Sequence, residues 1–183
     1  MKTDTFLQGL IYAALFGAGT AAGAYLMVPV PPVPITLQTL FLYLAGALLG
    51  GRLALLSQVV YLILGIIGLP VFAGGKAGLG VLFGPTGGYL IGFLPAAYIV
   101  GKWNEMLKAP SFSMVLLSMI AGTIPIYVLG VLQLCFVAKL GVGKAVSVGM
   151  LPFLIGDGIK IVVATLLAQR VVGHLRFRGK NND

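Results

Sequence analysis

Long apolar runs, separated by short polar segments or by segments rich in glycine and proline, are the main pattern of this 183-residue sequence. The runs are apolar on every side, as expected of helices that contact lipid. A helix needs about 20 such residues to cross the hydrocarbon of a bilayer, and three of the runs are shorter, so five spans also satisfy the pattern. We predict an all-α integral membrane protein with six transmembrane helices, at residues 6–28, 37–49, 53–67, 87–101, 114–137 and 146–172.

The composition supports a membrane location and removes several other classes of protein. Hydrophobic residues make up 59% of the chain and charged residues 9%, which leaves too little polar surface for a water-soluble globule. The net charge of +8 does not indicate nucleic-acid binding, because the basic residues lie mostly at the ends of apolar runs, where they suit lipid head groups. The single cysteine, Cys135, excludes an internal disulfide and a thiolate metal site. The single histidine, His174, lies among arginines and does not indicate an enzyme.

The distribution of lysine and arginine predicts the orientation of the chain. If both termini are cytoplasmic, the inner segments hold Lys2, Arg52, Lys102, Lys108, Arg170, Arg176, Arg178 and Lys180, and the outer segments hold Lys76, Lys139 and Lys144. Basic residues are enriched inside, so we expect both termini to be cytoplasmic. The polar segment 102–111 is then a cytoplasmic loop. The first run also resembles a signal peptide, but it is longer than the usual apolar region of one.

The last predicted helix alone holds charges well inside its apolar run, Asp157 and Lys160 in "LPFLIGDGIKIVV". A charge inside a membrane costs about 2.5–3.5 kcal/mol on insertion scales, so such residues usually serve a function. The three-residue separation places both side chains on one helix face, and the neighbouring Gly156 and Gly158 allow close approach. A carboxylate and an ammonium at fixed separation fit a cyclic urea, amide or imide. The spacing is also compatible with a structural pair that satisfies itself and, to a smaller extent, with proton relay through Asp157.

The segment "GLPVFAGGKAGLGVLFGPTGGY" interrupts two apolar runs at residues 68–89 and carries one charge, Lys76. We interpret residues 68–85 as an extracellular lid, because lids need backbone freedom at their hinges; a merely flexible loop has the same composition. The motif "GPTGGY" predicts a helix that starts near Thr86, with Tyr89 in its first turns. The glycines do not match a nucleotide-binding loop, so ATP must be bound elsewhere.

Small residues recur every four positions along the first predicted helix. They form two neighbouring series, Gly9, Ala13, Gly17 and Ala21, and Ala14, Ala18 and Ala22. Such a face permits close packing of another helix. The spacing leaves open whether that helix belongs to this chain or to another subunit.

Three motifs in order resemble the BioY family, the biotin-binding S-components of energy-coupling-factor (ECF) vitamin transporters. They are "PVPPVPITLQTL", "GLPVFAGGKAGLGVLFGPTGGYLIGF" and "FLIGDGIK". The resemblance covers nearly the whole chain and implies one six-helix domain, residues 1–183, in the cytoplasmic (inner) membrane of a prokaryote. It implies high-affinity capture of biotin from outside, without a cofactor, and association with a transmembrane coupling subunit and two cytoplasmic ATPase subunits. It assigns the contact with the coupling subunit to Ala14, Ala18 and Ala22.

The resemblance also implies a biotin site. The middle loop, the start of the fourth helix and the last helix contribute Lys76, Thr86, Tyr89, Asp157 and Lys160. The ureido ring of biotin has two N–H donors for Asp157 and a carbonyl for Lys160, and the biotin carboxylate pairs with Lys76 or with Lys160. Further expected contacts come from Thr36, Gln38 and Phe72.

Two functional hypotheses follow. The first is a non-enzymatic substrate-binding subunit for ATP-driven biotin uptake. The second is a stand-alone proton-coupled secondary transporter for a small anionic vitamin-like solute, with Asp157 as its proton site. The single intramembrane acid and the absence of a twofold sequence repeat argue against the second hypothesis.

Overall fold

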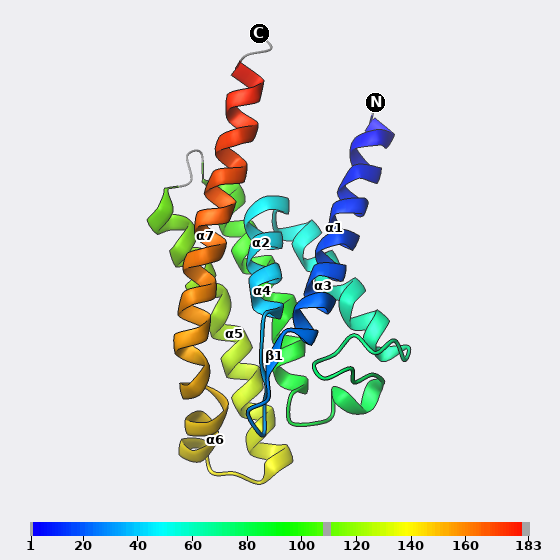
Figure 1. Cartoon of the computed structure of the whole chain (residues 1–183), viewed down its shortest axis with the longest axis vertical. Helices are drawn as coiled ribbons and strands as arrows, with labels where there is room; N and C mark the ends of the chain where they lie inside the picture. Colours follow the sequence, from blue (N-terminus) through cyan, green and yellow to red (C-terminus); the bar gives the residue numbers. More distant parts are fainter. Residues whose placement is uncertain (1, 108–110, 181–183) are drawn as a thin grey trace.

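A computed structural model describes the backbone of residues 2–107 and 111–180 and the side chains of residues 7–107 and 111–171. This part of the chain is mostly helical, which confirms the predicted class (Figure 1). The elements are α1 (Lys2–Tyr25), β1 (Met27–Val28), β2 (Ile35–Thr36), α2 (Gln38–Leu49), α3 (Gly51–Ile66), the 3-10 turn η1 (Leu79–Val81), α4 (Gly87–Met106), α5 (Phe112–Ala138), α6 (Val142–Gly149) and α7 (Leu151–Lys180). Lys108 and the side chains of Lys2, His174, Arg176, Arg178 and Lys180 lie outside the described residues.

Three described helical segments are long and apolar enough to cross a membrane: Leu7–Tyr25, Phe112–Ala138 and Leu151–Val171. The helix α2 is shorter, about 18 Å for its 12 residues. It contacts α1, α3, α4 and α7 and therefore lies in the interior of the helix bundle. A short helix in this position is shielded from lipid by its longer neighbours.

The structure differs from the predicted spans at three places. The predicted span 146–172 falls in two helices, because the helical conformation is interrupted at Met150, between α6 and α7. The first helix ends at Tyr25, and the proline-rich segment after it forms an antiparallel hairpin that pairs Met27 with Thr36. The predicted loop 102–111 is helical as far as Met106.

Successive long helices run in alternating directions, so that the start of α1 and the end of α7 lie at the same end of the bundle (Figure 1). Three elements lie towards the opposite end: the β1–β2 hairpin, the helix α6, and the loop that precedes α4. The polar network described below is therefore separated from the chain ends by much of the length of the bundle.

Glycines allow α4 and α5 to pack in direct backbone contact. A Cβ on Gly88 would lie 2.1 Å from the carbonyl oxygen of Leu129, and one on Gly92 would lie 2.7 Å from Cα of Ile126. A side chain at either position requires the helices to separate. This close crossing holds Tyr89 of α4 and Tyr127 of α5 in the same region of the interior.

The two series of small residues on α1 face different surroundings. Gly17 packs on α3, where an added Cβ would lie 2.8 Å from the carbonyl oxygen of Ser57. In the same series, Gly9 faces Leu53 of α3, Ala13 is buried and Ala21 is partly buried. The second series, Ala14, Ala18 and Ala22, is exposed along its length. The structure therefore assigns the first series to internal packing and leaves the second free on the surface.

Candidate functional site

One cavity brings together all the substrate-binding residues that the sequence predicts. Its lining comes from the β1–β2 hairpin, the glycine-rich loop (residues 68–85) and the helices α2, α4, α5 and α7. It has a volume of about 80 Å³ in this conformation. The predicted residues that line it are Thr36, Gln38, Phe72, Lys76, Thr86, Tyr89, Asp157 and Lys160.

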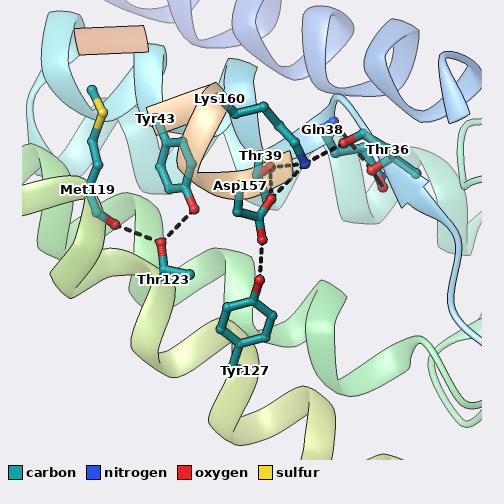
Figure 2. A network of polar contacts seen from close by, with 9 residues as sticks. All are labelled: Thr36, Gln38, Thr39, Tyr43, Met119, Thr123, Tyr127, Asp157 and Lys160. Atoms are coloured by element: carbon teal, nitrogen blue, oxygen red, sulfur yellow. Dashed lines mark hydrogen bonds and ion pairs between the residues drawn. The ribbon is translucent and has the colours of Figure 1, made fainter. Parts of the chain in front are cut away.

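A buried ion pair lies in the wall of this cavity (Figure 2). Asp157 and Lys160 occupy one face of α7, and Nζ of Lys160 lies 2.6 Å from Oδ1 of Asp157. Lys160 also donates to the carbonyl oxygen of Thr36 at 2.7 Å and to Oγ1 of Thr39 at 3.1 Å. The ammonium has three protons, so all of its donors are used within the protein.

The carboxylate of Asp157 is bound from three elements. Besides Lys160, it accepts a hydrogen bond from Oγ1 of Thr39 on α2, at 3.3 Å, and one from the hydroxyl of Tyr127 on α5. Both bonds from Lys160 and Thr39 reach Oδ1, whereas Oδ2 accepts only the Tyr127 bond among the described residues. A carboxylate oxygen can accept two hydrogen bonds, so Oδ2 retains one acceptor position for an N–H donor.

A second polar pair fixes the corner between β2 and α2. The hydroxyl of Thr36 donates to Oε1 of Gln38 at 2.8 Å, and the side-chain nitrogen Nε2 of Gln38 donates to the hydroxyl of Tyr61 on α3. The ring of Phe72 meets Tyr61 edge-on, with centroids 5.6 Å apart. Phe72 therefore packs against α3 in this conformation and gives the cavity an aromatic wall.

Tyr89 contributes its ring rather than its hydroxyl to the cavity. The hydroxyl donates to the carbonyl oxygen of Gly149 at 2.8 Å, at the junction of α6 and α7. Thr86 is the residue before the first turn of α4, which confirms the predicted helix start. Tyr89 thus offers apolar surface, and Thr86 places the N-terminal end of α4 beside the cavity.

Residues 72–76 of the glycine-rich loop form a compact turn in this structure. The amide of Gly75 donates to the carbonyl oxygen of Phe72 at 2.9 Å, and the amide of Phe72 donates to that of Lys76 at 3.0 Å. Gly74 and Gly75 have φ of 75° and 72°, a region that disfavours other residues. The turn presents Lys76 at the cavity with its side chain exposed to solvent.

Several side chains of the cavity are not among the residues predicted from the sequence. Tyr127 and Thr39 bind Asp157 directly, and Phe93 and Phe153 add aromatic surface. The hydroxyl of Tyr127 in an otherwise apolar run was an available signal, because a buried tyrosine hydroxyl needs a partner. Thr39 adjoins the predicted Gln38 and gave no separate signal.

The described side chains include no group of three or more histidine, cysteine, aspartate or glutamate residues able to hold a metal ion. The charged groups at the cavity are Asp157, Lys160 and Lys76. They can bind a neutral polar group and an anion by hydrogen bonds.

Comparison with known proteins gives a consistent result. A family model described as the BioY family matches residues 1–177. The chain is 45% identical to "Biotin transporter BioY" of Thermotoga maritima, over 90% of this chain and 96% of that protein. It is 41% identical to "Probable biotin transporter BioY" of Pyrococcus horikoshii, over 88% of this chain and 94% of that protein. Its structure resembles a crystal structure of the S-component for biotin from an ECF-type ABC transporter, with a TM-score of 0.88, 29% identity, and 94% and 95% coverage.

The buried ion pair predicts an asymmetric response to mutation. Lys160→Met leaves the Asp157 carboxylate buried without its cation and should destabilise the protein by about 3–5 kcal/mol. Adding Asp157→Asn removes the unpaired charge, so the double variant should be more stable than Lys160→Met. Thermal unfolding of the purified variants in detergent measures the difference.

The pair Lys102–Glu105 provides the matched control, because it has the same three-residue spacing but is exposed. Lys102→Met should change stability by less than about 1 kcal/mol. A double variant that is no more stable than Lys160→Met would contradict the assigned role of the buried pair.

Proposed function

The chain belongs to the BioY family, and we propose that it captures biotin outside the cell as the substrate-specific subunit of an ATP-driven ECF transporter. The observation that carries this proposal is the single cavity that collects the predicted binding residues from distant parts of the sequence. Relatives named as biotin transporters and the similar S-component for biotin support the choice of ligand. The whole chain, residues 1–183, forms one substrate-binding domain.

The ureido ring of biotin fits the buried end of the cavity. One of its N–H groups donates to the open acceptor position on Oδ2 of Asp157, beside the Tyr127 hydroxyl. Its carbonyl oxygen accepts from Lys160 in place of either Thr36 or Thr39, because every proton of Lys160 is already engaged. The ligand therefore exchanges one hydrogen bond of Lys160 for another and adds a hydrogen bond at Oδ2 of Asp157.

The carboxylate of biotin lies at the outer end of the cavity, near Lys76 and the N-terminal end of α4. Lys76 is exposed and forms no salt bridge among the described residues, in contrast to the fully engaged Lys160. The start of a helix also favours a negative charge. Between the two ends, Phe72 and Tyr89 pack against the apolar thiophane ring and valeryl chain.

The glycine-rich loop acts as a lid. The cavity of about 80 Å³ is smaller than the 300–1,000 Å³ typical of small-molecule sites. Biotin enters when the loop moves outward and is enclosed when it returns. The glycines with positive φ supply the necessary backbone freedom.

Six helices, α1 to α5 and α7, span the cytoplasmic membrane, and both termini are cytoplasmic. The alternating directions of these helices and the common end for the start of α1 and the end of α7 support this topology (Figure 1). The inner segments then carry most of the basic residues. The ligand cavity opens towards the outside.

The exposed series Ala14, Ala18 and Ala22 on α1 contacts the transmembrane coupling subunit. Small side chains let a helix of that subunit approach closely. Two cytoplasmic ATPase subunits supply the energy, since the sequence has no phosphate-binding loop of its own. The subunit carries out no covalent chemistry and needs no cofactor.

Reconstituted vesicles distinguish this function from proton-coupled transport. With coupling and ATPase subunits and ATP present, biotin should accumulate, and a protonophore should not abolish the accumulation. The chain alone should bind biotin but not accumulate it. Accumulation without ATPase subunits that a protonophore abolishes would contradict the proposal and support the secondary transporter.

The position of the biotin carboxylate predicts a ligand-specific effect of Lys76. Lys76→Ala should weaken biotin binding by about ten-fold, because it removes one charge-assisted hydrogen bond. It should leave binding of the neutral biotin amide unchanged. Calorimetry on the isolated protein, with Lys102→Ala as an exposed lysine away from the cavity, measures both affinities. An equal loss of affinity for biotin and for biotin amide in the Lys76→Ala variant would show that the biotin carboxylate does not lie at Lys76.

A further inference from the structure

A second concave site lies on the other side of the Asp157 wall, in a groove between α5, α6 and α7. It has a volume of about 580 Å³. In Figure 1, α5 and α7 run beside each other and α6 closes the end away from the chain termini. Tyr127 and Asp157 line both this groove and the ligand cavity. The biotin proposal does not use the groove.

The polar residues of the groove turn their polar atoms into the protein. The hydroxyl of Thr123 donates to the carbonyl oxygen of Met119 at 2.8 Å and lies 2.6 Å from the hydroxyl of Tyr43. The Tyr127 hydroxyl is bonded to Asp157, as described above. The carboxylate of Asp157 is bonded to Tyr127 and Lys160. Apart from Thr123, Tyr127 and Asp157, every lining residue is an aliphatic side chain, methionine or glycine. The groove therefore presents carbon to its occupant and suits a hydrocarbon chain.

The shape of the groove fits one extended chain. On α5 it reaches from Ile120 to Leu132, about 18 Å along the helix axis. The hydrocarbon of one leaflet is about 15 Å deep, half of the bilayer core. At Gly158 on α7 the groove is open, because no atom lies within 4 Å of the position of an added Cβ.

Two unpaired cations stand at the α6 end of the groove. Lys139 is the C-cap residue that ends α5, seven residues after the groove residue Leu132. Lys144 lies on α6, the short helix that contributes Val146 to the groove. Both lysines are exposed, and the salt bridges of the described residues involve neither of them. They complement a negatively charged head group.

We propose that this groove binds one acyl chain of an anionic phospholipid, with the lipid phosphate at Lys139 and Lys144. The proposal requires only that the chain lies in a membrane and is independent of biotin transport. The acyl chain covers the lipid-facing side of Tyr127 and Asp157 and keeps water away from the buried ion pair. The lipid is thus a structural partner of the wall that the ligand cavity shares.

Native mass spectrometry of the delipidated protein tests this site. The protein is titrated with an equimolar mixture of phosphatidylglycerol and phosphatidylcholine that carry identical acyl chains. One lipid should remain bound, and phosphatidylglycerol should be preferred by roughly 25-fold, at about five-fold for each lysine. The double variant Lys139→Ala/Lys144→Ala should retain a lipid but lose the preference.

A leucine in the open part of the groove should expel the lipid whatever its head group. Gly158→Leu fills the groove from α7, and Val128→Trp fills it from α5 should the first variant fail to fold. Ala14→Leu is the control, because it introduces the same side chain on an exposed face of α1. Retention of phosphatidylglycerol by a folded groove variant, or equal binding of the two lipids by the wild type, would overturn the proposal. A dimer in place of bound lipid would also overturn it and assign the groove to a second copy.

Discussion

The buried pair of opposite charges in α7 is the constraint on which the arrangement of this protein depends. Each charge is expensive in an apolar interior, so each must find partners within the bundle. Lys160 finds them at Thr36 and Thr39, and Asp157 finds them at Thr39 and Tyr127. The pair thereby fixes α7 against the β1–β2 hairpin, α2 and α5. The need of these buried charges for hydrogen-bond partners, in addition to apolar packing, sets the relative positions of these elements.

The same constraint explains why the pair is suited to recognition. Lys160 has no free proton, whereas Asp157 keeps one acceptor position on Oδ2 among the described residues. A ligand with adjacent N–H and carbonyl groups can use that position and take over one bond of Lys160. A ligand without an N–H group leaves the acceptor position on Oδ2 unfilled. In the proposed mode of binding, selectivity for a cyclic urea follows from the hydrogen bonds at this one site.

Much of this organisation is predictable from the sequence, because strong local signals carry it. Apolar runs gave the helices, and the rarity of intramembrane charge identified Asp157 and Lys160. The break at Met150 was missed because no charged residue separates α6 from α7, although Gly149 and Pro152 on either side of it were available signals. The role of Tyr127 was missed because it depends on which face of α5 meets α7. Such facts belong to tertiary packing, which a single sequence does not display.

The most direct test of the account is a calorimetric titration of the purified wild-type protein, without ATP or partner subunits. Biotin is compared with an analogue in which both ureido nitrogens are methylated. We expect saturable one-to-one binding of biotin and no measurable binding of the analogue, because Asp157 needs an N–H donor. Equal binding of both compounds, or no binding of biotin, would contradict the central role of the Asp157 carboxylate.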